Sequence, residues 1–215
     1  MKKVVVFLCV LVCAAASVSA VEAYVEADFS VPILLDSHTQ GSTTTKTTTV
    51  ELAGGISGRA MFTDMIGIYG AVDIVFPVSS TTTTTTTTLI GPVKTTTSFK
   101  RADYNKWFGV AALIAPAIVP VNKGMFKLLI APGLHINFLQ SEKLSITKSL
   151  TYLGFGMNVM AEFHFSKQFY LGVGSGFFYD FYAFTTTKTA IGNTSDKGRT
   201  GMFVVQPRIG IGFHF

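Results

Sequence analysis

The chain has 215 residues, which suits one domain that is large enough for a closed sheet. Its 17 basic and 12 acidic residues are scattered, with no Lys/Arg-rich run and no basic-aromatic constellation, so nucleic acid is not an expected partner. The composition is 48% hydrophobic, yet the longest apolar run after the N-terminal segment, Trp107 to Val121, is short and is broken by Pro116 and Pro120. A membrane-spanning helix is therefore excluded, and the apolar residues are spread over alternating segments instead.

The N-terminal residues 1–20 have the pattern of a secretory signal peptide, and residues 21–215 are expected to form the mature domain. Two lysines precede an apolar run, and small residues lead to a predicted cut after Ala20. Both cysteines lie in this segment, so the mature chain would carry no disulfide. The bulky Val12 directly before Cys13 fits a lipoprotein cleavage site poorly, which leaves lipid anchoring as a minor alternative. The mature net charge of +3, after loss of two of the 17 basic residues against 12 acids, says little about partners.

The mature sequence alternates between apolar and polar residues with the period of two that β-strands show. Eight strands are predicted, at residues 24–35, 50–62, 66–76, 107–120, 126–138, 152–165, 169–181 and 201–215. The fourth is apolar on both faces, so its orientation is left open. The connections after the first, third, fifth and seventh strands are long, and the others are short. If the first strand starts on the periplasmic side, every long connection lies outside the cell, as in outer-membrane barrels.

The predicted fold class is all-β, an eight-stranded antiparallel up-and-down transmembrane β-barrel with long extracellular loops and short periplasmic turns. A soluble lipocalin-like barrel also has eight such strands, but it fills its inside with apolar side chains and keeps its outside polar. Here the pattern is inverted, with apolar residues facing outward and small or polar residues facing a narrow lumen.

The last strand carries a more specific pattern. Four of its residues, Arg208, Gly210, Phe213 and Phe215, match the C-terminal assembly signal of bacterial outer-membrane β-barrels, which the barrel-assembly machinery reads. An ordinary amphipathic closing strand is the alternative. With the signal peptide and the loop asymmetry, the chain resembles the small eight-stranded outer-membrane barrels, the class of the OmpA barrel domain, OmpX, OmpW and the opacity proteins. OmpW is similar in length and in its Gly-x-Gly-aromatic-x-Phe ending. This resemblance implies an outer-membrane location, with outer-membrane lipid and the assembly machinery as partners.

Strand parity places a set of charged and polar residues on the inner face. This predicted lumen network is Glu26, Asp28, Glu51, Arg59, Asp73, Lys127, His135, Glu162, Asp180 and Arg208. Eight strands leave an interior just wide enough for side chains, so opposite charges should pair and plug the bore. The alternative is a gated narrow pore along Asp73, Asp180 and Arg208. One sequence does not separate these interpretations.

Aromatic residues near the strand ends predict two girdles that anchor the barrel at the membrane boundaries. The inner girdle comprises Phe62, Phe163, Phe165, Phe169, Phe213 and Phe215, and the outer one comprises Phe76, Trp107, Phe108, Phe138 and residues 177–182. Period-two glycines such as Gly172, Gly174 and Gly176 are interpreted as inward positions that leave room for bulky neighbours. No helix follows them, so a nucleotide-binding loop is not expected.

Threonine dominates the long connections, with eight consecutive threonines from Thr81 to Thr88. Because threonine is β-branched and favours strands, these segments could extend as hairpins, and the alternative is a solvated, sequence-tolerant loop. Three function hypotheses remain. The first is a surface-exposed structural and interaction protein, adhesin- or antigen-like, that contacts a host or environmental ligand through these loops. The second is an OmpW-like narrow channel for small or hydrophobic solutes.

The third and most remote hypothesis is an enzyme that modifies lipid A. Asp36, Ser37 and His38 are adjacent, but adjacent residues rarely place three side chains in relay geometry. The remaining histidines fall at different heights on different strands, with no metal-ligand spacing. The chain is therefore predicted not to be an enzyme, and no cofactor, metal or catalytic residue is expected.

Overall fold

The computed structural model describes residues 22–88 and 90–215, so the predicted signal peptide and the start of the mature chain at Val21 lie outside the described residues. Within them the chain forms ten β-strands and one 3-10 turn, η1 (Arg101–Asp103). The strands are β1 (Glu22–Ser30), β2 (Ile33–Gln40), β3 (Thr43–Met61), β4 (Ile66–Thr88), β5 (Gly91–Lys100), β6 (Lys106–Lys123), β7 (Phe126–Lys143), β8 (Ile146–His164), β9 (Phe169–Thr189) and β10 (Gly192–His214). No helix in this described part is long and apolar enough to cross a membrane.

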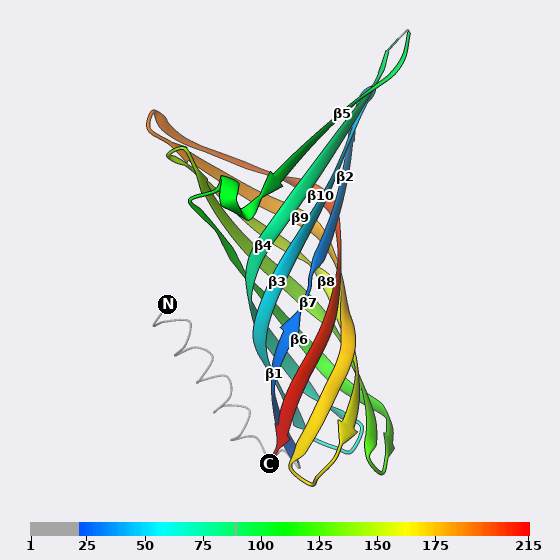
Figure 1. Ribbon diagram of the computed structural model, residues 1–215. Coiled ribbons are helices and arrows are strands. Elements are labelled where there is room, and N and C mark those ends of the chain that lie inside the picture. Colours follow the sequence, from blue (N-terminus) through cyan, green and yellow to red (C-terminus); the bar gives the residue numbers. More distant parts are fainter. Residues whose placement is uncertain (1–21, 89) are drawn as a thin grey trace.

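Antiparallel pairing closes the sheet into a ring in the order β1, β3, β4, β6, β7, β8, β9, β10 and back to β1 (Figure 1). The closing pair, β1 with β10, runs in register from Tyr24 opposite His214 to Ser30 opposite Arg208. The predicted eight-stranded up-and-down barrel is confirmed. A closed ring has no free strand edge within the wall, which satisfies the backbone hydrogen bonds that a lipid environment cannot.

The first barrel strand is broken, in contrast to the continuous strand predicted for residues 24–35. β1 ends at Ser30, and β2 continues its course from Ile33 between β3 and β10. Pro32 has no amide hydrogen to donate, so the ladder is interrupted there. Two bonds hold the break in place: the Val31 amide donates to the Pro207 carbonyl over 3.1 Å, and the Pro32 carbonyl accepts from the Glu51 amide over 2.9 Å.

The segments predicted as long connections are mostly strand, which corrects their boundaries. β3 and β4 run far past the barrel wall and pair with each other through their threonines, and β2 and β5 flank them to form a sheet that projects from one end of the barrel (Figure 1). β7 with β8 and β9 with β10 form two further hairpins at the same end. At the other end, the connections β3–β4, β6–β7 and β8–β9 are short. In the turn of the β7–β8 hairpin, Leu144 and Ser145 both have positive φ, at 48° and 65°.

Side chains on the barrel wall alternate between an exposed outer face and a buried inner face. Large apolar residues on the outer face include Ile56, Ile74, Leu134 and Ile209, with exposed fractions of 50–53%. The orientation of β6, left open by the sequence, is now fixed. Its odd-numbered residues, from Trp107 to Val119, face inward, and this makes one side of the lumen apolar.

Two members of the predicted outer aromatic girdle, Trp107 and Phe178, are wrong because both side chains face the lumen. The Trp107 side chain faces the lumen and is only 8% exposed, with its ring 4.4 Å from that of Tyr104. Its neighbour Phe108 points outward, as do Phe76 and Tyr179. Adjacent residues of a strand face opposite sides, so Trp107 and Phe108 could not both lie in the girdle.

Candidate functional site

The lumen near the short-turn end is closed by an arginine-carboxylate pair. Arg59 on β3 and Glu162 on β8 form a two-pronged ion pair across the bore, with the second bond 2.7 Å long, and their side chains are 3% and 1% exposed. The Arg59 guanidinium lies 3.8 Å from the centre of the Tyr24 ring, which stacks on His214 at 4.4 Å. A planar guanidinium suits such a two-pronged, ring-stacked position, which lysine would not fill.

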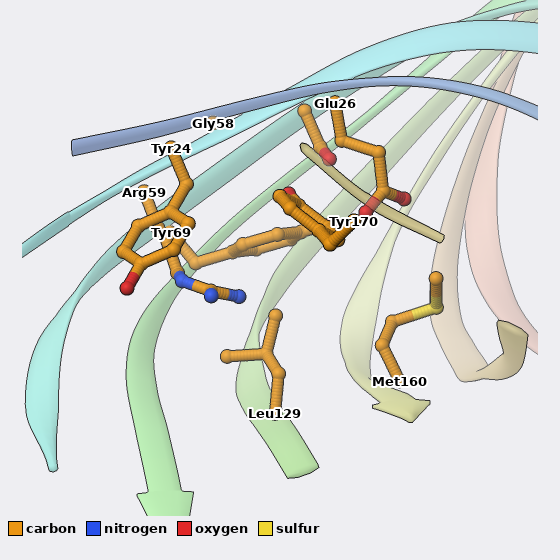
Figure 2. A pocket seen from close by; sticks show the side chains of 9 residues that line it. Tyr24, Glu26, Gly58, Arg59, Tyr69, Leu129, Met160 and Tyr170 are labelled. Carbon is orange, nitrogen blue, oxygen red and sulfur yellow. The ribbon is translucent and has the colours of Figure 1, made fainter. Parts of the chain in front are cut away.

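These residues converge on the space shown in Figure 2. The lining side chains come from β1, β3, β4, β7, β8 and β9 and include Tyr24, Glu26, Tyr69 and Tyr170, with the Arg59 guanidinium beside the Tyr24 ring. The cavity that they enclose is about 10 Å³. A space of that size holds one water molecule at most, so the bore is blocked at this level.

A second network crosses the middle of the lumen. Arg208 on β10 donates to Asp28 on β1 over 2.8 Å and to Asp73 on β4 over 2.7 Å. Gln206, two residues earlier on the same face, donates to Asp73 over 3.0 Å and to Ser30 over 2.7 Å. All of these side chains are buried. The network ties together the strands that close the barrel, and it fills the bore with paired charge.

The third layer lies toward the extended end. The Nδ1 atom of His135 is 2.8 Å from an oxygen of Asp180, and the imidazole stacks on Phe178 at 4.2 Å. Glu51 is 1% exposed, and neither of its carboxylate oxygens has a hydrogen-bond partner among the described residues. Asp180 therefore belongs to a different layer from Asp73 and Arg208, and the three predicted pore residues do not line one continuous path.

The inner glycines make room for these side chains. A Cβ atom built on Gly210 would lie 2.6 Å from Glu26, and one on Gly172 would lie 2.8 Å from the same carboxylate. On Gly212 it would overlap the Tyr170 ring. Two of the residues in the predicted assembly signal, Arg208 and Gly210, thus also have a place in the folded lumen.

The other two assembly-signal residues lie at the short-turn rim. The Phe213 ring packs edge-on against Phe169 at 5.1 Å and against Phe215 at 4.7 Å, and Phe215 is 72% exposed. An aromatic cluster at the end of an apolar belt is typical of a membrane boundary.

Among the remaining predicted lumen residues, Lys127 donates to the Tyr24 hydroxyl over 2.7 Å. Each predicted residue is thus placed inside the barrel, in one of three layers. The lumen network predicted from the sequence did not include Gln206, Ser30 or Asn158, although the alternation of faces along their strands places all three on the inner face. Asn158 donates to the Tyr69 hydroxyl over 3.0 Å.

An aromatic and basic cluster at the mouth was not predicted from the sequence. Phe99 and Tyr104 lie 6.3 Å apart, and the Lys143 ammonium is 5.0 Å from the Phe99 ring and 5.4 Å from that of Tyr104. Burial, followed by the charge of Asp103, raises the pKa of the Tyr104 phenol, which keeps it neutral. Phe99 lies on β5, Tyr104 in the connection before β6 and Lys143 on β7, so the cluster forms only when these segments come together in the fold.

The threonine-rich sheet of β2 to β5 is the other candidate site. Its hydroxyls meet across neighbouring strands on both faces. On the inner face Thr43 meets Thr86 at 3.2 Å and Thr47 meets Thr82 at 3.1 Å. On the outer face Thr83 meets Thr96 at 3.3 Å. Such pairs stabilise the sheet.

The adjacent Asp36, Ser37 and His38 do not form a catalytic relay. Asp36 and His38 face one side of β2 and Ser37 faces the other, so the three side chains do not converge. The part of the chain in residues 22–88 and 90–215 holds no group of three or more His, Cys, Asp or Glu residues arranged to hold a metal ion.

Comparison with protein-family models and with curated proteins finds no match. Solved structures do match. Neisserial surface protein A is 11% identical, with a TM-score of 0.53 over 90% of this chain and 97% of that chain. The outer membrane protein OprG from Pseudomonas aeruginosa is 14% identical, with a TM-score of 0.50 over 91% and 96%. The outer membrane protein AlkL, determined in DMPC bilayers, is 8% identical, with a TM-score of 0.50 over 90% of each chain.

At such low identities the likeness shows the fold alone. The chain has the fold of the small eight-stranded bacterial outer-membrane β-barrels. In barrels of this kind the short turns are periplasmic and the long connections are extracellular. In this chain the threonine-rich sheet lies at the end opposite the short turns, and large apolar side chains are exposed around the wall.

Proposed function

We propose that this protein is an outer-membrane barrel that acts as a closed anchor for an extracellular interaction surface. The observation that carries the proposal is the strand pairing of the threonine-rich segments. Thr43 to Thr49 pair with Ser80 to Thr86, and these in turn pair with β5, so the surface is a sheet continuous with the wall. A paired sheet is already ordered, so a partner that binds it does not have to order a flexible loop.

The filled lumen supports an anchor over a conduit. Three layers of buried side chains cross the bore, and the cavity beside Arg59 is about 10 Å³. An open eight-stranded pore would need these pairs to separate, which would leave buried charges without partners at a cost of about 3–5 kcal/mol for each pair.

The chemistry of the sheet suits contact with proteins or glycans. Threonine presents a methyl group and a hydroxyl, and in this sheet both recur at about 4.8 Å across strands and about 6.7 Å along them. A partner can thus bury apolar area and exchange hydrogen bonds over the same surface. The proposed partner is a host or environmental ligand, such as a matrix protein or a surface glycan.

Hairpin replacement tests the proposal. In the test variant, Ser80 is joined to Phe99 through an Asn-Gly turn, which removes the outer parts of β4 and β5. In the control variant, Thr186 is joined to Ser195 in the same way, which shortens the hairpin of β9 and β10. Bacteria that display each chain are measured for adhesion to matrix-coated surfaces and to epithelial cells. Adhesion should fall only in the test variant, while permeability to small dyes stays unchanged in both.

A second candidate, a conduit for small or hydrophobic solutes, draws on one feature of the wall. β10 pairs with β2 at only three positions, Phe203 to Val205. Above them a space of about 380 Å³ lies between the strands, lined by Asp36, Ser37, His38, Thr200 and Gly201. A solute could leave the mouth sideways through this seam, but it would still meet the Arg208 layer below. Discrete single-channel openings of the refolded mature chain, altered by Arg208→Ala, would favour this candidate.

A further inference from the structure

Most lysines of the extracellular strand extensions lie on the outer face of the sheet. Residues paired across antiparallel strands point to the same side. Lys197 is paired with Phe184, whose ring is 46% exposed on the outer face, and Lys106 precedes the inward Trp107. Side chains alternate between the two faces along each strand, and paired residues share a face. Applied to the observed strand pairs, this rule places six exposed lysines on the outer face: Lys46, Lys94, Lys100, Lys106, Lys188 and Lys197.

The acidic residues of the same extensions are distributed differently. Asp36 is paired with Thr47, and Asp196 with Thr185, so both face inward. Within the described strand extensions, the acid on the outer face is Glu142, which lies 3.3 Å from Lys106. That ion pair is exposed, with 65% of the lysine side chain accessible, so it is weak and can yield to a stronger anion. The outer face is thus strongly basic, although the mature chain as a whole is nearly balanced.

The heights of Lys100 and Lys106 match a definite layer of the membrane. Lys106 is two residues from the outward Phe108, and Lys100 is opposite Ser79, three residues beyond the outward Phe76. At a rise of about 3.3 Å per residue these cations lie about 7–10 Å along the strand from the exposed rings. The first polar layer outside the hydrocarbon begins at that distance, and it contains the lipid headgroups.

We propose that the outward lysines nearest the wall, Lys100, Lys106 and Lys197, bind the phosphate groups of the phosphorylated glycolipid that surrounds the barrel in the outer leaflet. The surface is continuous with the apolar belt that already faces lipid, and its charge complements an anionic headgroup. Lys100 and Lys106 come from β5 and β6, whereas Lys197 comes from β10, on another side of the ring. No single small anion can reach them all, whereas lipids encircle the wall.

This lipid-binding girdle is separate from the proposed interaction surface. It uses Lys100, Lys106 and Lys197, which lie outside the segment that the hairpin replacement removes, whereas Lys46 and Lys94 lie on the projecting threonine sheet. Loss of adhesion on hairpin replacement and loss of lipid binding on lysine replacement are therefore independent results. The girdle would also hold the barrel at a fixed depth, because the cations resist sinking into hydrocarbon and the apolar belt resists rising into water.

A matched pair of double variants tests the girdle. K100Q/K197Q removes two outward lysines, and K143Q/K148Q removes two lysines that face the mouth at the same end. The refolded mature chain in neutral detergent micelles is titrated with fluorescent bisphosphorylated lipid A and with its dephosphorylated form. Resistance of the folded barrel to unheated dodecyl sulfate verifies that each variant is folded.

The wild-type chain should prefer the phosphorylated lipid, and this preference should weaken as salt is added. K100Q/K197Q should bind the phosphorylated lipid about thirty-fold less tightly, and K143Q/K148Q should stay within about two-fold of wild type. Equal losses in both variants, equal affinity for both lipids, or full competition by millimolar inorganic phosphate would each overturn the proposal. Retention of a soluble sulfated polysaccharide in place of lipid would overturn it as well.

Discussion

Replacing Arg208 by alanine removes the cation from the middle layer of the lumen. Its guanidinium lies 2.8 Å from Asp28 and 2.7 Å from Asp73, and its side chain is 1% exposed. At an effective dielectric constant of about 20, each contact corresponds to a gross attraction of about 6 kcal/mol. Desolvation of the three groups cancels much of this, and the measured cost of breaking such buried pairs is about 3–5 kcal/mol. We expect a loss of that size in the free energy of unfolding.

Urea unfolding of the refolded mature chain in phosphatidylcholine vesicles would measure the loss, because unfolding of the barrel releases the buried pairs. The control is the triple variant D28N/D73N/R208M, which has no charge in this layer. It should recover most of the lost stability, since replacement of a whole buried ion network by neutral groups is often close to neutral. If the free energy of unfolding of Arg208→Ala is within about 1 kcal/mol of the wild-type value, the layer is hydrated and the lumen is not plugged as described.

Three further predictions follow from particular side chains. Gly212→Ala should lower the free energy of unfolding in urea by about 1–3 kcal/mol, because its Cβ would overlap the Tyr170 ring. Gly70→Ala, with open space around it, should change that free energy by less than about 0.5 kcal/mol. Replacing residues 144–145 by Asn-Gly should stabilise the β7–β8 hairpin by about 1–2 kcal/mol, seen as slower amide exchange there, because both positions have positive φ; unchanged exchange would contradict the strain. The fluorescence of Trp107, the single tryptophan, should resist quenching by brominated acyl chains because it faces the lumen; strong quenching would return it to the lipid-facing girdle.

The three proposed features lie at different heights along the barrel axis. Buried charge closes the lumen within the wall, and the proposed lipid-binding lysines lie just above it. The paired threonines belong to the sheet that projects farthest (Figure 1). Because Arg208, the pair Lys100 and Lys197, and the threonines are different residues, a variant in one of these features should leave the other two intact. Stability, lipid binding and adhesion can therefore be measured as separate properties of the same chain.

The sequence by itself determined the fold class and which face of most strands each residue occupies. Side chains of a strand alternate with a period of two, so parity alone placed Glu26, Arg59 and Arg208 on the inner face, where the structure buries them. The alternation of long and short connections likewise predicted the up-and-down ring. The sequence did not show which face of β6 points inward, because both faces are apolar. For that reason Trp107 was predicted to lie in the outer girdle, although its side chain faces the lumen.

Only the tertiary structure decided which residues meet. Arg59 pairs with Glu162, 103 positions away, and Arg208 pairs with Asp73, 135 positions away, because ring closure and register bring β3 opposite β8 and β10 near β4. A homopolymer such as Thr81 to Thr88 carries no register of its own, so its order comes from the partners on β3 and β5. The outward sorting of the lysines has the same origin, since a net charge does not reveal which face of a sheet carries it.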